Sequence, residues 1–90
     1  MTDRPYHVEV VPRAGRDLEQ LPGKVATACV EFIFTTLAAN PHRVSKPLFR
    51  ELAGQRSARR GSYRIVFRVN DDTRLIEVLR VSLRRHAYRT

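Results

Sequence analysis

Apolar and polar side chains alternate with a period of two in several short stretches of the chain. From Tyr63 to Val69, apolar residues fill every odd position and arginine fills two of the three even positions. This period is typical of a strand with one buried face, and it predicts a strand over residues 63–70. Similar patterns predict strands over residues 6–11, 56–60 and 74–83. The last alternates imperfectly, which a bulge near Val78 and Leu79 would explain.

Apolar residues recur at spacings of three and four in two further stretches, as on one face of a helix. They predict a short helix from Ala14 to Leu21 and a longer one from Lys24 to about Ala39. We expect the longer helix to be buried on more than one side, because its apolar stripe is wide. Pro22 and Gly23 separate the helices, and Pro41 ends the second. Two helices joined by so tight a turn should form an antiparallel hairpin.

The segment between the second helix and the later strands, residues 41–55, contains two prolines and a glycine. We interpret it as a connection without regular structure. Its apolar side chains, Leu48, Phe49 and Leu52, are expected to anchor it against the core.

These elements predict a single α+β domain over residues 1–90, in the order β-α-α-β-β-β. Turn sequences at 60–62 and 70–73 join the last three strands as hairpins. The helical hairpin is expected to pack on one face of a mainly antiparallel four-stranded sheet. The helices also give enough length for a crossover, so the first strand can run parallel to a later one.

Charge is distributed unevenly along the chain. Residues 1–45 hold five basic and five acidic residues, whereas residues 46–90 hold twelve basic and four acidic ones, which accounts for the whole net charge of +8. Fifteen of the seventeen basic residues are arginine, whose planar fork suits contacts with phosphate. A basic surface on one side indicates a nucleic acid or an acidic protein as partner. The alternative is a solvated surface with no partner.

Arginine is an unusual choice for the interior of a strand. Arg64 and Arg68 share one face of the predicted strand 63–70, and Arg59 and Arg60 lie just across the turn. A guanidinium group is not buried without a partner. This face therefore meets solvent, acidic side chains or phosphates, and a structural ion pair is the alternative to phosphate contact.

Other classes of protein find no support in the sequence. No apolar run approaches the roughly 20 residues of a membrane span, and the first residues lack the apolar core of a signal peptide. The single cysteine, Cys29, excludes an internal disulfide and suits a reducing compartment. We therefore expect a cytoplasmic protein, and with no metal-ligand spacing present we expect no metal or cofactor.

Four short motifs stand out in the second half of the chain. They are Lys46-Pro47-Leu48, Glu51-Leu52-x-Gly54, Ser57-Ala58-Arg59-Arg60-Gly61-x-Tyr63-Arg64 and Arg84-x-x-x-Tyr88. These motifs resemble those of RelE toxins, part of the RelE/ParE superfamily of bacterial toxin–antitoxin systems, and they are most similar to the actinobacterial branch. The order of predicted elements matches that fold over almost the whole chain.

The resemblance implies a small ribosome-dependent endoribonuclease that inhibits translation. Such toxins enter the ribosomal A site and cut mRNA there without a metal, by attack of a ribose 2′-OH on the adjacent phosphate. Arg64 matches the family's catalytic arginine, Arg84 the basic residue at the end of the last strand, and Tyr88 the C-terminal tyrosine. Arg59 matches a position that is lysine in well-studied members, and Ser57 falls where another lysine can stand.

The remaining candidates for RNA contact are Lys46, Ser57, Arg60, Arg68 and Arg85. Arg59 and Arg60 are equally suited to docking an acidic antitoxin.

The residues that transfer protons in this reaction are not assigned by the arginines alone. Arginine stays protonated, so Arg59, Arg64 and Arg84 can stabilise a pentacoordinate phosphorane by charge but cannot act as a base. Tyr88, with a reference pKa of about 10, and His86, with one of about 6.5, are the candidates for proton transfer. Tyr88 as a packing aromatic and His86 as a solvated residue are the alternatives. Many family members have a histidine where this chain has Leu83.

The expected partners are an acidic antitoxin, the ribosome with its 16S rRNA and mRNA, and operator DNA reached only through the antitoxin. No membrane contact is expected. Two other functions remain open at this point. One is inhibition of DNA gyrase, as in the ParE branch, and the other is a non-toxic module that binds an antitoxin.

Overall fold

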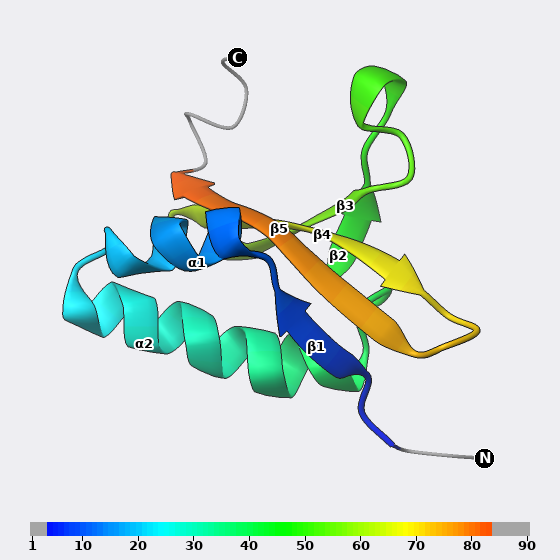
Figure 1. Ribbon diagram of the computed structural model, residues 1–90, viewed down its shortest axis with the longest axis horizontal. Coiled ribbons are helices and arrows are strands. Elements are labelled where there is room, and N and C mark those ends of the chain that lie inside the picture. Colours follow the sequence, from blue (N-terminus) through cyan, green and yellow to red (C-terminus); the bar gives the residue numbers. More distant parts are fainter. Residues whose placement is uncertain (1–3, 84–90) are drawn as a thin grey trace.

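A computed structural model describes residues 4–83 of the chain. Two helices cover one face of a five-stranded sheet with the strand order β1-β5-β4-β3-β2 (Figure 1). The elements in chain order are β1 (His7–Val10), α1 (Pro12–Glu19), α2 (Gly23–Phe32), the π-helical turn η1 (Ile33–Leu37), β2 (Ser45–Pro47), the 3₁₀ turn η2 (Arg50–Leu52), β3 (Arg56–Arg60), β4 (Tyr63–Asn70) and β5 (Leu75–Leu83).

The sheet has one strand more than the four that the sequence predicts. β2 lies inside the segment interpreted as a connection, and it pairs antiparallel with β3. Ser45 lies opposite Ala58, Lys46 opposite Ser57, and Pro47 opposite Arg56. It is only three residues long and ends in proline, which suits an edge strand. A strand this short shows no readable alternation, so the prediction of four strands was wrong.

The first strand closes the other edge of the sheet. β1 runs parallel to β5, with His7 opposite Leu75 and Val10 opposite Val78, so the parallel pairing allowed by the sequence is confirmed. In β5 the partner of Val66 is Arg80, whereas the partner of Phe67 is Val78. Leu79 is therefore the extra residue of the expected bulge.

The core lies between the helices and the inner face of the sheet. α1 and α2 run antiparallel beside each other (Figure 1), as the hairpin pattern predicts. The main cluster of buried apolar residues draws on both helices, on η1 and on β3, β4 and β5. Among the described residues its members are Ala14, Cys29, Ile33, Leu37, Ala58, Ile65, Phe67, Ile76, Val78 and Val81.

The longer helix buries one side only, contrary to the sequence-based expectation. Cys29, Ile33 and Leu37 form its buried stripe, at a spacing of four residues. Val30 and Phe34 lie on its outer side, with 38% and 50% of their surface exposed. The wide apolar stripe thus exceeds what the single sheet can cover.

The connection between β2 and β3 stands away from the body of the molecule (Figure 1). Phe49 is 73% exposed and Leu52 is 43% exposed, so the prediction that they anchor this segment to the core was wrong. Backbone contacts hold the base of the connection instead, since the Leu48 amide donates to the Gln55 carbonyl at 2.9 Å.

One carboxylate joins α1 to the sheet where β1 has ended. Asp17 Oδ2 accepts hydrogen bonds from Arg80 Nε and from the Val81 amide, both at 2.9 Å. The Asp17 carboxylate therefore provides a hydrogen-bond acceptor for the Val81 amide, which lies beyond the last β1–β5 pair, Val10 with Val78. The same contact holds the Arg80 guanidinium against α1, so Arg80 does not join Arg64 and Arg68 on the basic face of β4.

Candidate active site

A groove of about 530 Å³ lies on the sheet face turned away from the helices. It crosses β2, β3 and β4. Its lining residues are Arg43, Val44, Ser45, Lys46, Pro47, Leu48, Ser57, Arg59 and Arg64. Four of these carry a positive charge and none carries a carboxylate, so the groove is suited to an anion.

Strand register brings the basic residues of this groove together. Arg59 on β3 lies directly opposite Arg64 on β4, and Lys46 on β2 lies directly opposite Ser57 on β3. Adjacent strands are about 4.8 Å apart, and residues two positions apart on one strand are about 7 Å apart and share a face. The two pairs therefore form neighbouring rows on one face of the sheet.

The buried residues beside Arg64 fix its direction. Ile65 and Phe67 are fully buried against the helices, so the even-numbered residues of β4 must point to the opposite face. The tight turn at the end of β3 sets the pairing of Arg59 with Arg64. Gly61 in that turn has φ +62°, a left-handed conformation that glycine adopts without strain.

Lys46, Ser57, Arg59 and Arg64 are the predicted site residues that the structure brings together. Arg43 also lines the groove, although no pattern along the chain pointed to it. It precedes the short strand β2, and only the pairing of β2 with β3 reveals its position. Ser82 lies opposite Arg64 on β5, so it shares this face of the sheet.

Two other predicted RNA-contact residues lie away from the groove. Arg60 shares a strand face with the buried Ala58, on the helical side of the sheet. The charge of Arg60 also acts on the Cys29 thiol of α2, where it opposes the rise in pKa that burial causes. This agrees with the position of Arg60 on the helical side. Arg68 lies four residues beyond Arg64, about 13 Å along the strand, and its Nη1 is 3.7 Å from Oε1 of Glu77.

The predicted site residues Arg84, Arg85, His86 and Tyr88 lie outside the described residues. Within residues 4–83, no group of three or more histidine, cysteine, aspartate or glutamate side chains gathers to hold a metal ion. No helix in that range is long and apolar enough to cross a membrane.

A second hollow, of about 460 Å³, lies at the other end of β4. Its charged residues are Arg68, Asp71, Asp72 and Glu77. Three carboxylates against one guanidinium make it a poor place for a polyanion. The groove over β2, β3 and β4 is therefore the better candidate site.

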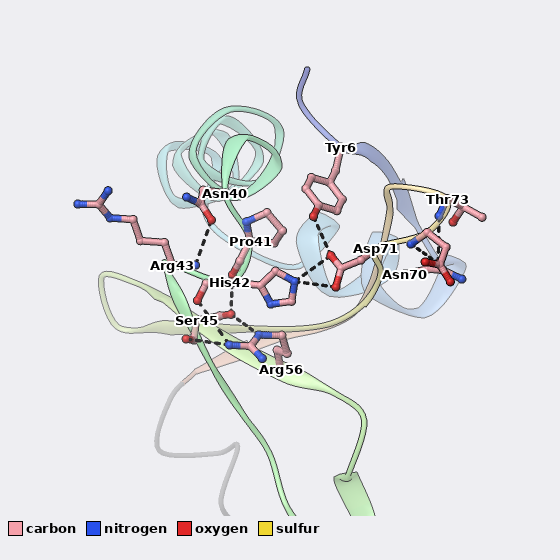
Figure 2. A network of polar contacts seen from close by, with 11 residues as sticks. Tyr6, Asn40, Pro41, His42, Arg43, Ser45, Arg56, Asn70, Asp71 and Thr73 are labelled. Atoms are coloured by element: carbon pink, nitrogen blue, oxygen red, sulfur yellow. Dashed lines mark hydrogen bonds and ion pairs between the residues drawn. The ribbon is translucent and has the colours of Figure 1, made fainter. Parts of the chain in front are cut away.

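A cluster of polar contacts joins three distant segments beside this second hollow (Figure 2). The Tyr6 hydroxyl donates to Asp71 Oδ1 at 2.7 Å, and His42 Nε2 lies 2.9 and 3.1 Å from the two Asp71 oxygens. The Arg74 guanidinium lies 4.1 Å from the centre of the Tyr6 ring. The cluster ties the start of β1 to the β4–β5 turn and to the segment after α2, which is a structural role.

These contacts shift two pKa values in opposite directions. The hydrogen bonds from His42 and Tyr6 lower the pKa of the Asp71 carboxyl below its ordinary value. The bond to Asp71 raises the pKa of the Tyr6 hydroxyl. A carboxyl with a lowered pKa stabilises the fold above its unfolded pKa of about 3.9, and this contribution is lost as the pH falls through the folded value.

We therefore expect Asp71→Asn to be less stable than the unchanged protein at pH 6, with the difference shrinking below about pH 4. Because 58% of the Asp71 side chain is exposed, solvent screening should limit the effect to about 1 kcal/mol or less. Urea unfolding at pH 6 and pH 3 measures it. A difference between the two proteins that is the same at both pH values would contradict the assignment.

Comparison with known proteins places the chain in a family. The family model for the ParE toxin of the type II toxin–antitoxin system parDE matches residues 8–88. Toxin RelE of Mycobacterium tuberculosis is 48% identical over 97% of this chain and 90% of its own length, and Toxin RelG of the same organism is 48% identical over 94% and 98%.

A solved structure agrees with this sequence similarity. The toxin–antitoxin complex RelBE2 from Mycobacterium tuberculosis contains a chain that matches with a TM-score of 0.87 and 48% identity, over 90% of this chain and all of that one. The predicted resemblance to RelE-type toxins is thereby confirmed. The chain belongs to the RelE/ParE family of toxins from type II toxin–antitoxin systems.

Proposed function

We propose that this toxin is a ribosome-dependent endoribonuclease that cuts mRNA in the A site without a metal. The observation that carries the proposal is the groove in which Arg59 and Arg64 lie opposite each other, with Arg43 and Lys46 beside them. Such a set of cations on an open sheet face fits the phosphate backbone of a single RNA strand. The similarity to two proteins named as RelE-type toxins supports the same activity.

The proposed reaction begins when a ribose 2′-oxygen attacks the adjacent phosphorus. The phosphorane that forms carries two negative charges on its equatorial oxygens. We assign the binding of those oxygens to Arg59 and Arg64, which lie opposite each other in the groove. Cations at such positions stabilise the charge that develops in a transition state. The bond between phosphorus and the 5′-oxygen then breaks, and the products are a 2′,3′-cyclic phosphate and a 5′-hydroxyl. The proton lost by the attacking 2′-hydroxyl passes to solvent water, and the leaving 5′-oxygen takes up one proton in exchange.

An acidic antitoxin is the partner that this surface favours. The RelBE2 structure is a toxin–antitoxin complex, which supports an antitoxin partner for this chain. Because no carboxylate is among the described residues that line the groove, an acidic segment of the antitoxin would complement it and exclude RNA. Contact with operator DNA would then pass through the antitoxin.

Inhibition of DNA gyrase is the second candidate function, since the matching family model describes ParE toxins. Two assays separate the candidates. The first maps mRNA 5′ ends after brief induction, and the second follows supercoiling by purified gyrase. New ends inside translated codons with normal supercoiling support the endoribonuclease. Blocked supercoiling without new ends would replace it with gyrase inhibition, and neither effect would leave a non-toxic antitoxin-binding module.

RNA binding by the groove should depend strongly on salt. If three or four phosphates are neutralised, log K should fall against log salt with a slope of about −2 to −3 for a single strand. Arg59→Ala removes one of these cations and should make the slope shallower by about 0.7. Fluorescence anisotropy with a short single-stranded RNA at several salt concentrations measures both slopes.

The matched control is Arg13→Ala, which removes the same charge from an exposed position on α1. It should leave the slope unchanged. Equal slopes for Arg59→Ala and the unchanged protein would show that Arg59 does not contact phosphate.

A further inference from the structure

We propose that Arg56 positions two cations of the groove for RNA binding by holding the short edge strand β2 in place. The inference rests on the proposed endoribonuclease function and adds to it a residue that lies outside the groove. It is carried by three hydrogen bonds that the Arg56 guanidinium donates to the chain beside Arg43 and Lys46.

The strand β2 has few contacts of its own to hold it. It is three residues long, lies at the edge of the sheet and pairs with β3 alone. Its last residue, Pro47, has no amide proton to donate. Two of the four cations among the described lining residues of the groove, Arg43 and Lys46, lie shortly before this strand and within it. The position of both cations therefore depends on what fixes β2.

Arg56 supplies this support through a single guanidinium group (Figure 2). Its Nε donates to Ser45 Oγ at 2.7 Å, and its Nη2 donates to the carbonyls of Ser45 and His42 at 3.3 and 3.4 Å. His42 directly precedes Arg43 in the chain, and Ser45 is followed directly by the second cation, Lys46. Arg56 thus fixes the backbone next to each of the two cations.

Arg56 lies on the opposite face of the sheet from the groove. Its partner on β4 is Phe67, which is fully buried on the helical side, and residues directly opposite each other share a face. The next residue, Ser57, lines the groove and is paired with Lys46. Arg56 is accordingly not among the described residues that line the groove. Apart from its charge, Arg56 can therefore act on bound RNA only through the strand that it holds.

Other contacts keep the segment before β2 attached to the fold without Arg56. His42 Nε2 lies 2.9 and 3.1 Å from the two carboxylate oxygens of Asp71. The Ser45 hydroxyl donates to the carbonyl of Pro41 at 2.6 Å, and Pro41 is itself buried. Loss of the Arg56 contacts should therefore loosen β2 and leave the domain folded.

The test measures how binding to a short single-stranded RNA depends on salt, by fluorescence anisotropy. Each lost phosphate contact makes the slope of log K against log salt shallower by about 0.7. Arg56→Ala removes one charge outside the groove, yet it should make the slope shallower by about 1.4, because Arg43 and Lys46 both lose their positions. Adding Arg43→Ala and Lys46→Ala to Arg56→Ala should then change the slope little further. An unchanged slope for Arg56→Ala would overturn the proposal, as would full additivity of the three substitutions.

Arg56→Lys separates the position of the strand from the charge of the side chain, because lysine keeps the charge but lacks the planar fork that reaches three acceptors. It should also make the slope shallower. Arg13→Lys, the same change at an exposed position of α1, is the matched control and should leave the slope unchanged. A normal slope for Arg56→Lys would show that charge alone suffices, and this would overturn the proposal.

Hydrogen exchange tests the hold of Arg56 on β2 without RNA. In Arg56→Lys the amides of residues 42–48 should lose protection, whereas the amides of β4 should keep theirs. Equal exchange in the variant and the unchanged protein would contradict the proposal, and loss of protection throughout the sheet would make Arg56 a general stabilising residue instead. Failure of the unchanged protein to bind or cut RNA would overturn the proposed function, whereas the exchange result would still decide whether Arg56 holds β2.

Discussion

Replacing Arg64 by alanine is expected to lower mRNA cleavage by about 100- to 1,000-fold, the usual effect of removing one donor that stabilises transition-state charge. Arg64 lies opposite Arg59 on the open face of the sheet and lines the groove. The loss should appear in the rate of the chemical step, because the phosphorane carries one more negative charge than the bound RNA phosphate. Single-turnover cleavage on programmed ribosomes measures it.

Lysine at the same position provides a graded comparison. Arg64→Lys keeps the positive charge but loses the planar fork that binds two phosphate oxygens at once. Its rate should fall between those of the alanine variant and the unchanged protein. Arg13→Ala, which removes a charge on α1, should cleave normally. Full activity of Arg64→Ala, with a melting temperature close to that of the unchanged protein, would remove Arg64 from the active site.

Replacing Phe67 by alanine is expected to destabilise the fold by about 3–5 kcal/mol. Phe67 is fully buried in β4, and among residues 4–83 it is the largest of the fully buried side chains. A small domain has about 5–15 kcal/mol of total stability, so this single change removes a large part of it. The melting temperature should fall by more than about 10 °C, which calorimetry or circular dichroism measures.

Phe49 offers a matched control for this prediction, since it is the same residue type with 73% of its surface exposed. Phe49→Ala should change the stability by no more than about 0.5 kcal/mol. Similar losses of stability in both variants would contradict this contrast, because they would mean that the Phe49 side chain is covered in the folded protein.

The parts of the fold that the sequence predicted well are those with long, regular patterns. The strict alternation of β4 and the turn sequences on either side of it gave the bounds of β3 and β4 correctly. Even the bulge at Leu79 showed as a break in the alternation. The wrong predictions concern segments in which the pattern of apolar residues does not reveal a strand or does not match the observed burial. β2 is too short to alternate, and Phe49, Leu52, Val30 and Phe34 are apolar but exposed.

The candidate site was predictable in part for the same reason. Alternation put Arg64 on the face away from the core, and the hairpin put Arg59 beside it. It did not separate Arg59 from Arg60, because that distinction depends on which of two neighbours shares a face with the buried Ala58. The position of Arg43 and the pairing of Lys46 with Ser57 depend on contacts between β2 and β3, which no local pattern encodes.

The pairing of the first strand with the last has a consequence for how the chain folds. His7 and Leu75 are partners although they are 68 positions apart, whereas β3, β4 and β5 pair with their neighbours in sequence. Local pairings form first because long loops close at a higher entropic cost, and proteins rich in distant contacts fold slowly. The arginine pair of β3 and β4 therefore belongs to the early-forming hairpin, and closure of β1 on β5 should limit the folding rate.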